Sequence, residues 1–165
     1  MGLRQMLFGS GETIAGAIYG TIVVMATIVG AGSAADPDAW RVAVAVVVST
    51  SVLALAHLYS EGIAGSIAKR RRLTKEERAA IWRHELAIPL AAVPPVMALL
   101  LGAFEVIEES TAIWTAILIG LATLAIQGLR YAQIEQLSPM GTVISVTINF
   151  GLGLLMVGLK AAISH

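Results

Sequence analysis

Five apolar segments, each about 20 residues long and almost free of charge, constrain this chain more than any other feature. At a rise of about 1.5 Å per residue, such a helix crosses the roughly 30 Å hydrocarbon core of a bilayer. Hydrophobic residues make up 57% of the 165 residues and charged residues 13%, which excludes a soluble globular enzyme. We predict an all-α membrane protein whose spans are 13–31, 42–68, 86–104, 111–129 and 141–159.

The connections between these segments are short. We therefore expect residues 1–165 to form a single domain of five transmembrane helices. The first apolar run exceeds the roughly 7–15 apolar residues of a signal peptide, so we interpret it as a retained span. The second segment is long enough to extend beyond the bilayer into the cytoplasm.

The net charge is zero, but the charges are segregated along the chain. Acidic residues follow spans one and three, whereas a basic run follows span two: Lys69, Arg70, Arg71, Arg72, Lys75, Arg78 and Arg83. Basic residues mark the cytoplasmic ends of spans. This alternation predicts a cell (inner) membrane protein with a cytoplasmic N-terminus and an external C-terminus. We interpret the basic run as an anchor on anionic lipid, and we expect the bilayer rather than nucleic acid as its partner.

The stretch 73–85 joins spans two and three. Thr74 and Glu77 have the spacing of a capping box, in which side chains satisfy the free amides of a helix start. We predict a short cytoplasmic helix that leads into span three. Glu76, Glu77, His84 and Glu85 are secondary candidates for a cytoplasmic metal site; the alternative is a solvated charged helix.

Three ionisable residues fall within or at the edge of the spans. His57 and Glu61 lie four residues apart on one face of the second helix, and Glu12 opens the first. By the predicted orientation, all three lie toward the cytoplasmic end. A carboxylate–imidazole–carboxylate set binds a divalent transition metal or relays protons. In the alternative interpretation, His57 is hydrogen-bonded in the bundle and both carboxylates reach interfacial water.

Small residues recur at four-residue spacing in two spans. Gly16 and Gly20 form a GxxxG motif in the first, and Gly141, Ser145, Asn149 and Gly153 form a stripe in the fifth. Such faces let helices approach closely. We expect packing or formation of a homodimer, with pore lining by Asn149 and Ser145 as the alternative.

Span three contains Pro89, Pro94 and Pro95, each of which removes a backbone donor. We predict a kinked helix, either beside a transport pathway or simply for packing.

This layout resembles the vacuolar iron transporter family, which has five spans, a long second helix projecting into the cytoplasm and a linker before span three. Gly11–Gly16 (GETIAG) lies where the family has its acidic motif at the start of span one. Ala56–Gly62 (AHLYSEG) lies at the family's second-helix motif, and Leu137–Met140 (LSPM) precedes span five as in the family. The resemblance implies a homodimer with a metal path between protomers and proton exchange.

We therefore predict a transporter of divalent metal cations that exchanges protons and has no tightly bound cofactor, the metal being its substrate. No Walker loop, Rossmann glycine pattern, HExxH or GxSxG is present, so we do not expect an enzyme. The alternative is a non-transporting membrane scaffold or accessory subunit. A third possibility is an ion channel, with Asn149 as the best pore residue.

Overall fold

The computed structural model of the chain describes residues 11–32 and 38–163. Within these ranges the chain forms six helices and no strand. The helices are α2 (Gly11–Ala31), α3 (Ala39–Lys69), α4 (Lys75–Glu85), α5 (Ala87–Ala103), α6 (Glu109–Ile134) and α7 (Pro139–Ile163). Helix α4 and helix α5 are separated only by Leu86.

Five stretches of the described chain have the length and apolar composition needed to cross a membrane. They are α2, α3, α4 together with α5, α6 and α7. This confirms the prediction of an all-α, multi-pass membrane protein. The helices begin and end within a few residues of the predicted spans, except that α6 and α7 each continue several residues beyond them.

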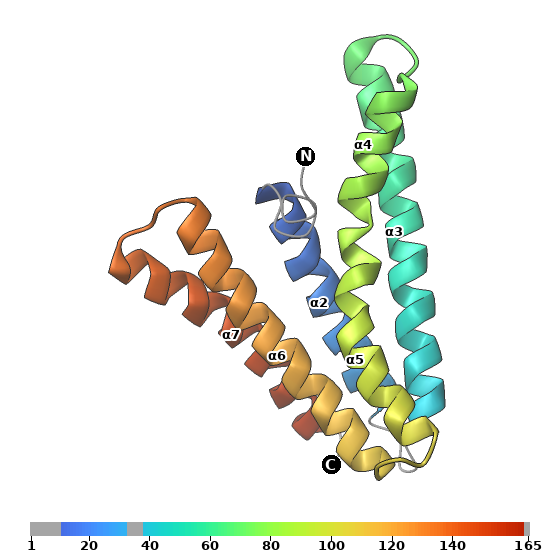
Figure 1. The fold of residues 1–165 in the computed structure, drawn as a ribbon, viewed down its shortest axis with the longest axis vertical. Coiled ribbons are helices and arrows are strands. Elements are labelled where there is room, and N and C mark those ends of the chain that lie inside the picture. Colours follow the sequence, from blue (N-terminus) through green and yellow to red (C-terminus); the bar gives the residue numbers. More distant parts are fainter. Residues whose placement is uncertain (1–10, 33–37, 164–165) are drawn as a thin grey trace.

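Helix α2 is the central element, because it contacts each of the other five helices of the described chain. Helix α3 packs beside α5, and α6 pairs with α7 (Figure 1). The core between them is apolar and fully buried; its largest side chains include Met25, Ile28, Val46, Leu99, Ile117 and Leu124.

Glycines permit the close approach of α2 to α5. A Cβ atom added at Gly20 would lie 2.7 Å from the carbonyl oxygen of Ile88, and one added at Gly16 would lie 3.3 Å from the Ala87 Cβ. The predicted GxxxG face is therefore used for packing within the chain. The homodimer remains a prediction.

The polar stripe of α7 lies against α6. The Ser145 hydroxyl donates to the carbonyl oxygen of Gly128 at 2.9 Å, and the Asn149 amide donates to the carbonyl oxygen of Ser145 at 3.0 Å. Both side chains are buried. The Ser145 bond joins α7 to α6, whereas the Asn149 bond lies within α7. Both residues also line a hollow of about 480 Å³, so packing and pore lining both remain predictions. Nearby, Gln127 Oε1 is buried without a hydrogen-bond partner in the described part of the chain.

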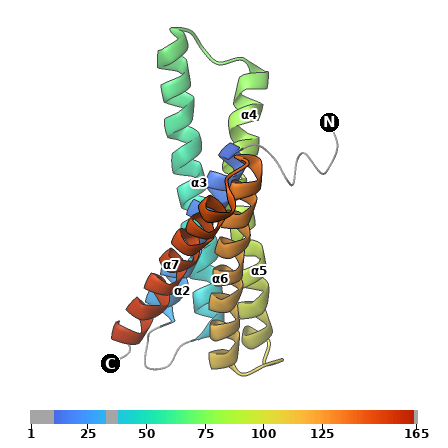
Figure 2. The same cartoon turned by 90° about the vertical axis from the view of Figure 1, so that its left-hand side faces the viewer.

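Helices α3 and α4 form a hairpin that extends beyond the ends of the other helices (Figures 1 and 2). The 31 residues of α3 span about 46 Å, which exceeds the roughly 30 Å hydrocarbon core. The long second helix and the following short helix are thus both present as predicted.

The predicted capping box is confirmed at the start of α4. The Thr74 hydroxyl accepts from the Glu77 amide at 3.3 Å, and the Glu77 carboxylate accepts from the Thr74 amide at 2.8 Å. Hydrogen bonds from Arg71, then from Lys69 and the Thr74 amide, hold the pKa of Glu77 below its usual range. The charged groups of Lys69, Arg71 and Glu77 precede the apolar part of the α4–α5 stretch, so they lie outside the membrane-spanning segment.

All three prolines of span three lie within α5. Pro89 lies in its first turn, where a missing amide donor leaves no intrahelical bond unmade. Pro94 and Pro95 lie in the interior, yet the helix continues through them to Ala103, with Pro95 buried against its neighbours.

Large apolar side chains remain exposed on the outer faces of the bundle. On α3 they recur at helical spacing and form one continuous stripe: Val44, Val47, Val48, Val52 and Leu55. Exposed apolar surface of this extent is consistent with contact with lipid.

Candidate functional site

A buried acid lies between two imidazoles where α4 meets α5. Glu85 is only 3% exposed. One of its carboxylate oxygens lies 3.4 Å from His57 Nδ1, and the other lies 3.3 Å from His84 Nδ1. The Tyr19 ring lies beside the His57 ring, with centroids 5.4 Å apart. Helices α2, α3 and α4 thus each contribute to one cluster.

Helix periodicity explains why Glu85 faces inward. Leu86 keeps a right-handed helical conformation, with φ of −62° and ψ of −17°, so α5 continues nearly in phase with α4. Ile81, Glu85 and Ile88 are spaced by four and three residues and consequently share a face. Ile88 is buried in the bundle and Ile81 is half-buried, and the carboxylate is turned inward with them.

Gly16 allows the α4–α5 junction to approach α2. An added Cβ at this position would lie 3.3 Å from the Ala87 Cβ and 3.8 Å from the His84 carbonyl oxygen. A larger residue here would push the junction away from α2. The small-residue motif of α2 therefore helps to position the buried acid.

The contacts of Glu85 with His57 and His84 are longer than ordinary hydrogen bonds. Their lengths, 3.3 and 3.4 Å, exceed the usual 2.7–3.2 Å range of nitrogen–oxygen hydrogen bonds. The carboxylate is covered, with 4% of its side chain exposed, whereas the His57 and His84 side chains are 40% and 36% exposed. Placing a charged carboxylate at the edge of the membrane's apolar core costs free energy unless a proton or a cation neutralises it. The cluster is therefore suited to take up a positive charge.

The three residues predicted within or at the edge of the spans have separate outcomes in the structure. His57 belongs to the cluster. Glu61 lies one turn further toward the hairpin tip, is exposed, and makes no hydrogen bond or ion pair with a described residue. The side chain of Glu12, at the start of α2, lies outside the described residues.

The four secondary candidates fall into two pairs at opposite ends of α4. His84 and Glu85 join His57, whereas Glu76 and Glu77 lie about 12 Å away along the helix axis. Glu77 is engaged by the capping box and by Lys69 and Arg71. Within residues 11–32 and 38–163, no three acidic, histidine or cysteine side chains are arranged to hold a metal ion.

The sequence named Glu85 only as a secondary metal candidate, and it did not name Tyr19 at all. Glu85 was expected among linker residues, yet it is the central buried group, and its four-residue spacing from Ile81 was the available sequence signal. Tyr19 was not predicted, because no pattern in α2 links this aromatic ring to α3.

Comparisons with protein-family models, with curated proteins and with solved structures give no match to this chain. The resemblance to the vacuolar iron transporter family remains a prediction. The chain is thus described by its own geometry, as a multi-pass membrane protein with a buried carboxylate between two imidazoles at the edge of its apolar region.

Proposed function

We propose that this protein transports divalent metal cations across its membrane in exchange for protons. The observation that supports the proposal is the buried Glu85 carboxylate between His57 and His84. Glu85 and His57 form the centre of the proposed site, and His84 extends it toward the hairpin.

The depth of the cluster suits an entrance to a transport path. His57 follows Ala39, the first residue of α3, by 18 positions, which is about 27 Å along the helix. It therefore lies near the far edge of a hydrocarbon core of roughly 30 Å. Glu85 directly precedes the apolar segment of α5, so both groups lie where an ion would leave water.

The residue types suit both proposed cargoes. Imidazole exchanges protons in the physiological pH range. Carboxylate and imidazole are also ligands of divalent transition metals. An arriving cation would displace protons from the imidazoles and pair with the carboxylate, and its departure would let the protons return. The cluster would thus bind either protons or a metal cation, each in place of the other.

Flux into proteoliposomes tests this proposal. Liposomes that contain the purified chain are loaded with a metal-sensitive or a pH-sensitive dye, and Mn²⁺ or Co²⁺ is added outside. We expect metal entry coupled to proton movement in the wild type. Glu85→Gln removes the charge with little change in shape and should reduce both signals to those of empty liposomes, while His57→Ala should reduce them strongly.

Glu135→Gln is the matched control, because it makes the same substitution at an exposed residue at the end of α6. It should transport as the wild type does. Wild-type rates in Glu85→Gln would contradict the proposed site. Absence of flux from every protein, with the fold intact, would instead favour a non-transporting scaffold or accessory subunit.

A further inference from the structure

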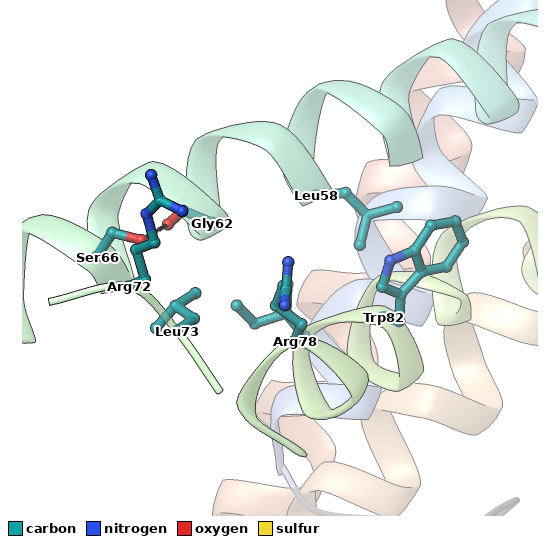
Figure 3. Close-up of a pocket in the computed structure, with 8 residues that line it drawn as sticks. Leu58, Gly62, Ser66, Arg72, Leu73, Arg78 and Trp82 are labelled. Atoms are coloured by element: carbon teal, nitrogen blue, oxygen red, sulfur yellow. Dashed lines mark hydrogen bonds between the residues drawn. The ribbon is translucent and has the colours of Figure 1, made fainter. Parts of the chain in front are cut away.

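A second feature of the α3–α4 hairpin is a hollow between the two helices, separate from the cluster of Glu85 and the two histidines. Its volume is about 320 Å³, within the range of about 300–1,000 Å³ that is usual for small-ligand sites. Figure 3 shows that the Arg78 side chain of α4 lies between Trp82 and Leu73, opposite α3. The lining residues are Leu58, Gly62, Ser66, Arg72, Leu73, Arg78, Ile81 and Trp82.

The lining carries positive charge that no carboxylate balances. None of its residues is acidic. At the nearby hairpin tip, Glu77 pairs with Lys69 and Arg71. By contrast, the guanidinium groups of Arg72 and Arg78 make no hydrogen bond or ion pair with the described residues. Two free forked donors therefore remain at the hollow, and such forks match the oxygens of a phosphate group.

The rest of the lining is apolar and amphipathic. Leu58 on α3 and Trp82 on α4 form its end nearest the bundle, whereas Ser66 and Arg72 lie toward the hairpin tip. A ligand that fits a hollow with one apolar and one basic end carries an apolar group at one end and an anionic group at the other. Free phosphate would leave the apolar end unused.

The depth of the hollow matches the headgroup layer of a bilayer. From Ala39, Leu58 lies about 29 Å and Ser66 about 41 Å along α3. If α3 begins at one edge of the roughly 30 Å core, the hollow starts at the opposite edge and extends through the headgroups, which add about 5–7 Å on each side. Trp82 then lies at the membrane interface, where tryptophan is enriched.

We propose that this hollow binds the phosphate of an anionic phospholipid. Arg72 and Arg78 hold the phosphate oxygens, and Leu58, Ile81 and Trp82 contact the glycerol backbone and the first methylenes of the acyl chains. The site is distinct from general attraction of a basic loop to a charged surface, because it depends on two particular arginines.

Native mass spectrometry of the full chain in detergent tests the proposal. The probes are phosphatidylglycerol, phosphatidylcholine with the same acyl chains, and inorganic phosphate. We expect one phosphatidylglycerol to bind in preference to phosphatidylcholine and to resist displacement by inorganic phosphate. The double variant Arg72→Gln/Arg78→Gln should weaken phosphatidylglycerol binding by about tenfold or more.

Arg70→Gln/Lys75→Gln is the matched control, because it removes the same net charge from exposed residues of the same segment that do not line the hollow. It should bind phosphatidylglycerol as the wild type does. An equal loss of binding in both double variants would overturn the proposal and indicate surface charge alone. Equal affinity for the two lipids would also overturn it, and so would displacement of the lipid by inorganic phosphate.

Discussion

Polar groups are buried in two regions of this protein, and they differ in how they are satisfied. At the α6–α7 interface, Ser145 donates a hydrogen bond of ordinary length to the Gly128 carbonyl of α6, and Asn149 donates one to the Ser145 carbonyl of its own helix. At the α4–α5 junction, the Glu85 carboxylate lies 3.3 and 3.4 Å from two histidines. In the first arrangement both side chains reach a carbonyl oxygen at ordinary hydrogen-bond length, whereas in the second the two nitrogen–oxygen distances are longer than that.

This difference separates polar groups that hold helices together from those available for chemistry. A neutral side chain bonded to a backbone carbonyl stabilises a helix pair and has no further capacity to change. Under the proposed function, a buried carboxylate with more loosely placed imidazoles would exchange a proton for a cation without disrupting the bundle. Burial alone would not distinguish the two kinds of polar group, because the side chains of Asn149 and Glu85 are both largely buried.

The sharpest test of this comparison replaces Glu85 by leucine. Transport should be lost, whereas the free energy of unfolding should change little, because an apolar side chain suits this buried position and the His57 and His84 side chains left behind are 40% and 36% exposed. Thermal unfolding in detergent, measured beside the flux assay, checks both outcomes. A strongly destabilised Glu85→Leu protein would mean that the carboxylate is structural, as Ser145 is.

A second substitution tests the packing that positions the acid. Gly20→Val should destabilise the fold by about 1–3 kcal/mol, because its Cβ would lie 2.7 Å from the Ile88 carbonyl oxygen and 2.9 Å from the Ile88 Cα. Gly30→Val is the matched control in the same helix, since nothing lies within 4 Å of its added Cβ. Similar unfolding midpoints for the two variants would contradict close α2–α5 packing.

The hydrogen bond between α7 and α6 should have a smaller effect. Ser145→Ala removes the bond to the Gly128 carbonyl, and such bonds in membrane proteins contribute about 0.6 kcal/mol on average. We expect a small loss of stability and unchanged transport. Loss of transport from this variant would indicate that the α6–α7 interface belongs to the pathway, as the pore-lining alternative requires.

The smallest expected effect is local, at the tip of the hairpin. Because the pKa of Glu77 is lowered in the folded protein, its contribution is present above the unfolded pKa of about 4.3 and is lost as the pH falls below it. Hydrogen exchange of the Thr74 and Glu77 amides should therefore lose protection at acid pH. At neutral pH, Glu77→Gln should increase trypsin cleavage near Arg71, whereas Glu135→Gln should not.

Much of the fold follows from local sequence patterns. Runs of apolar residues predict the five spans because each backbone polar group must be satisfied within its own helix in a bilayer. The capping box at Thr74 and Glu77 was predictable for a similar reason, since it involves residues three positions apart. Placement of Glu85 and Tyr19 beside His57 was not, because those contacts join separate helices.

The sequence by itself determined a helical, multi-pass membrane protein with a long second helix and a charged linker. Only the tertiary structure decided which charges are buried together, and which small-residue faces are covered by the chain's own helices. Hydrophobicity and helix caps act over a few residues, whereas the approach of α2 to the α4–α5 junction depends on what packs against Gly16 and Gly20. That approach brings a linker carboxylate, rather than the expected Glu61, to His57.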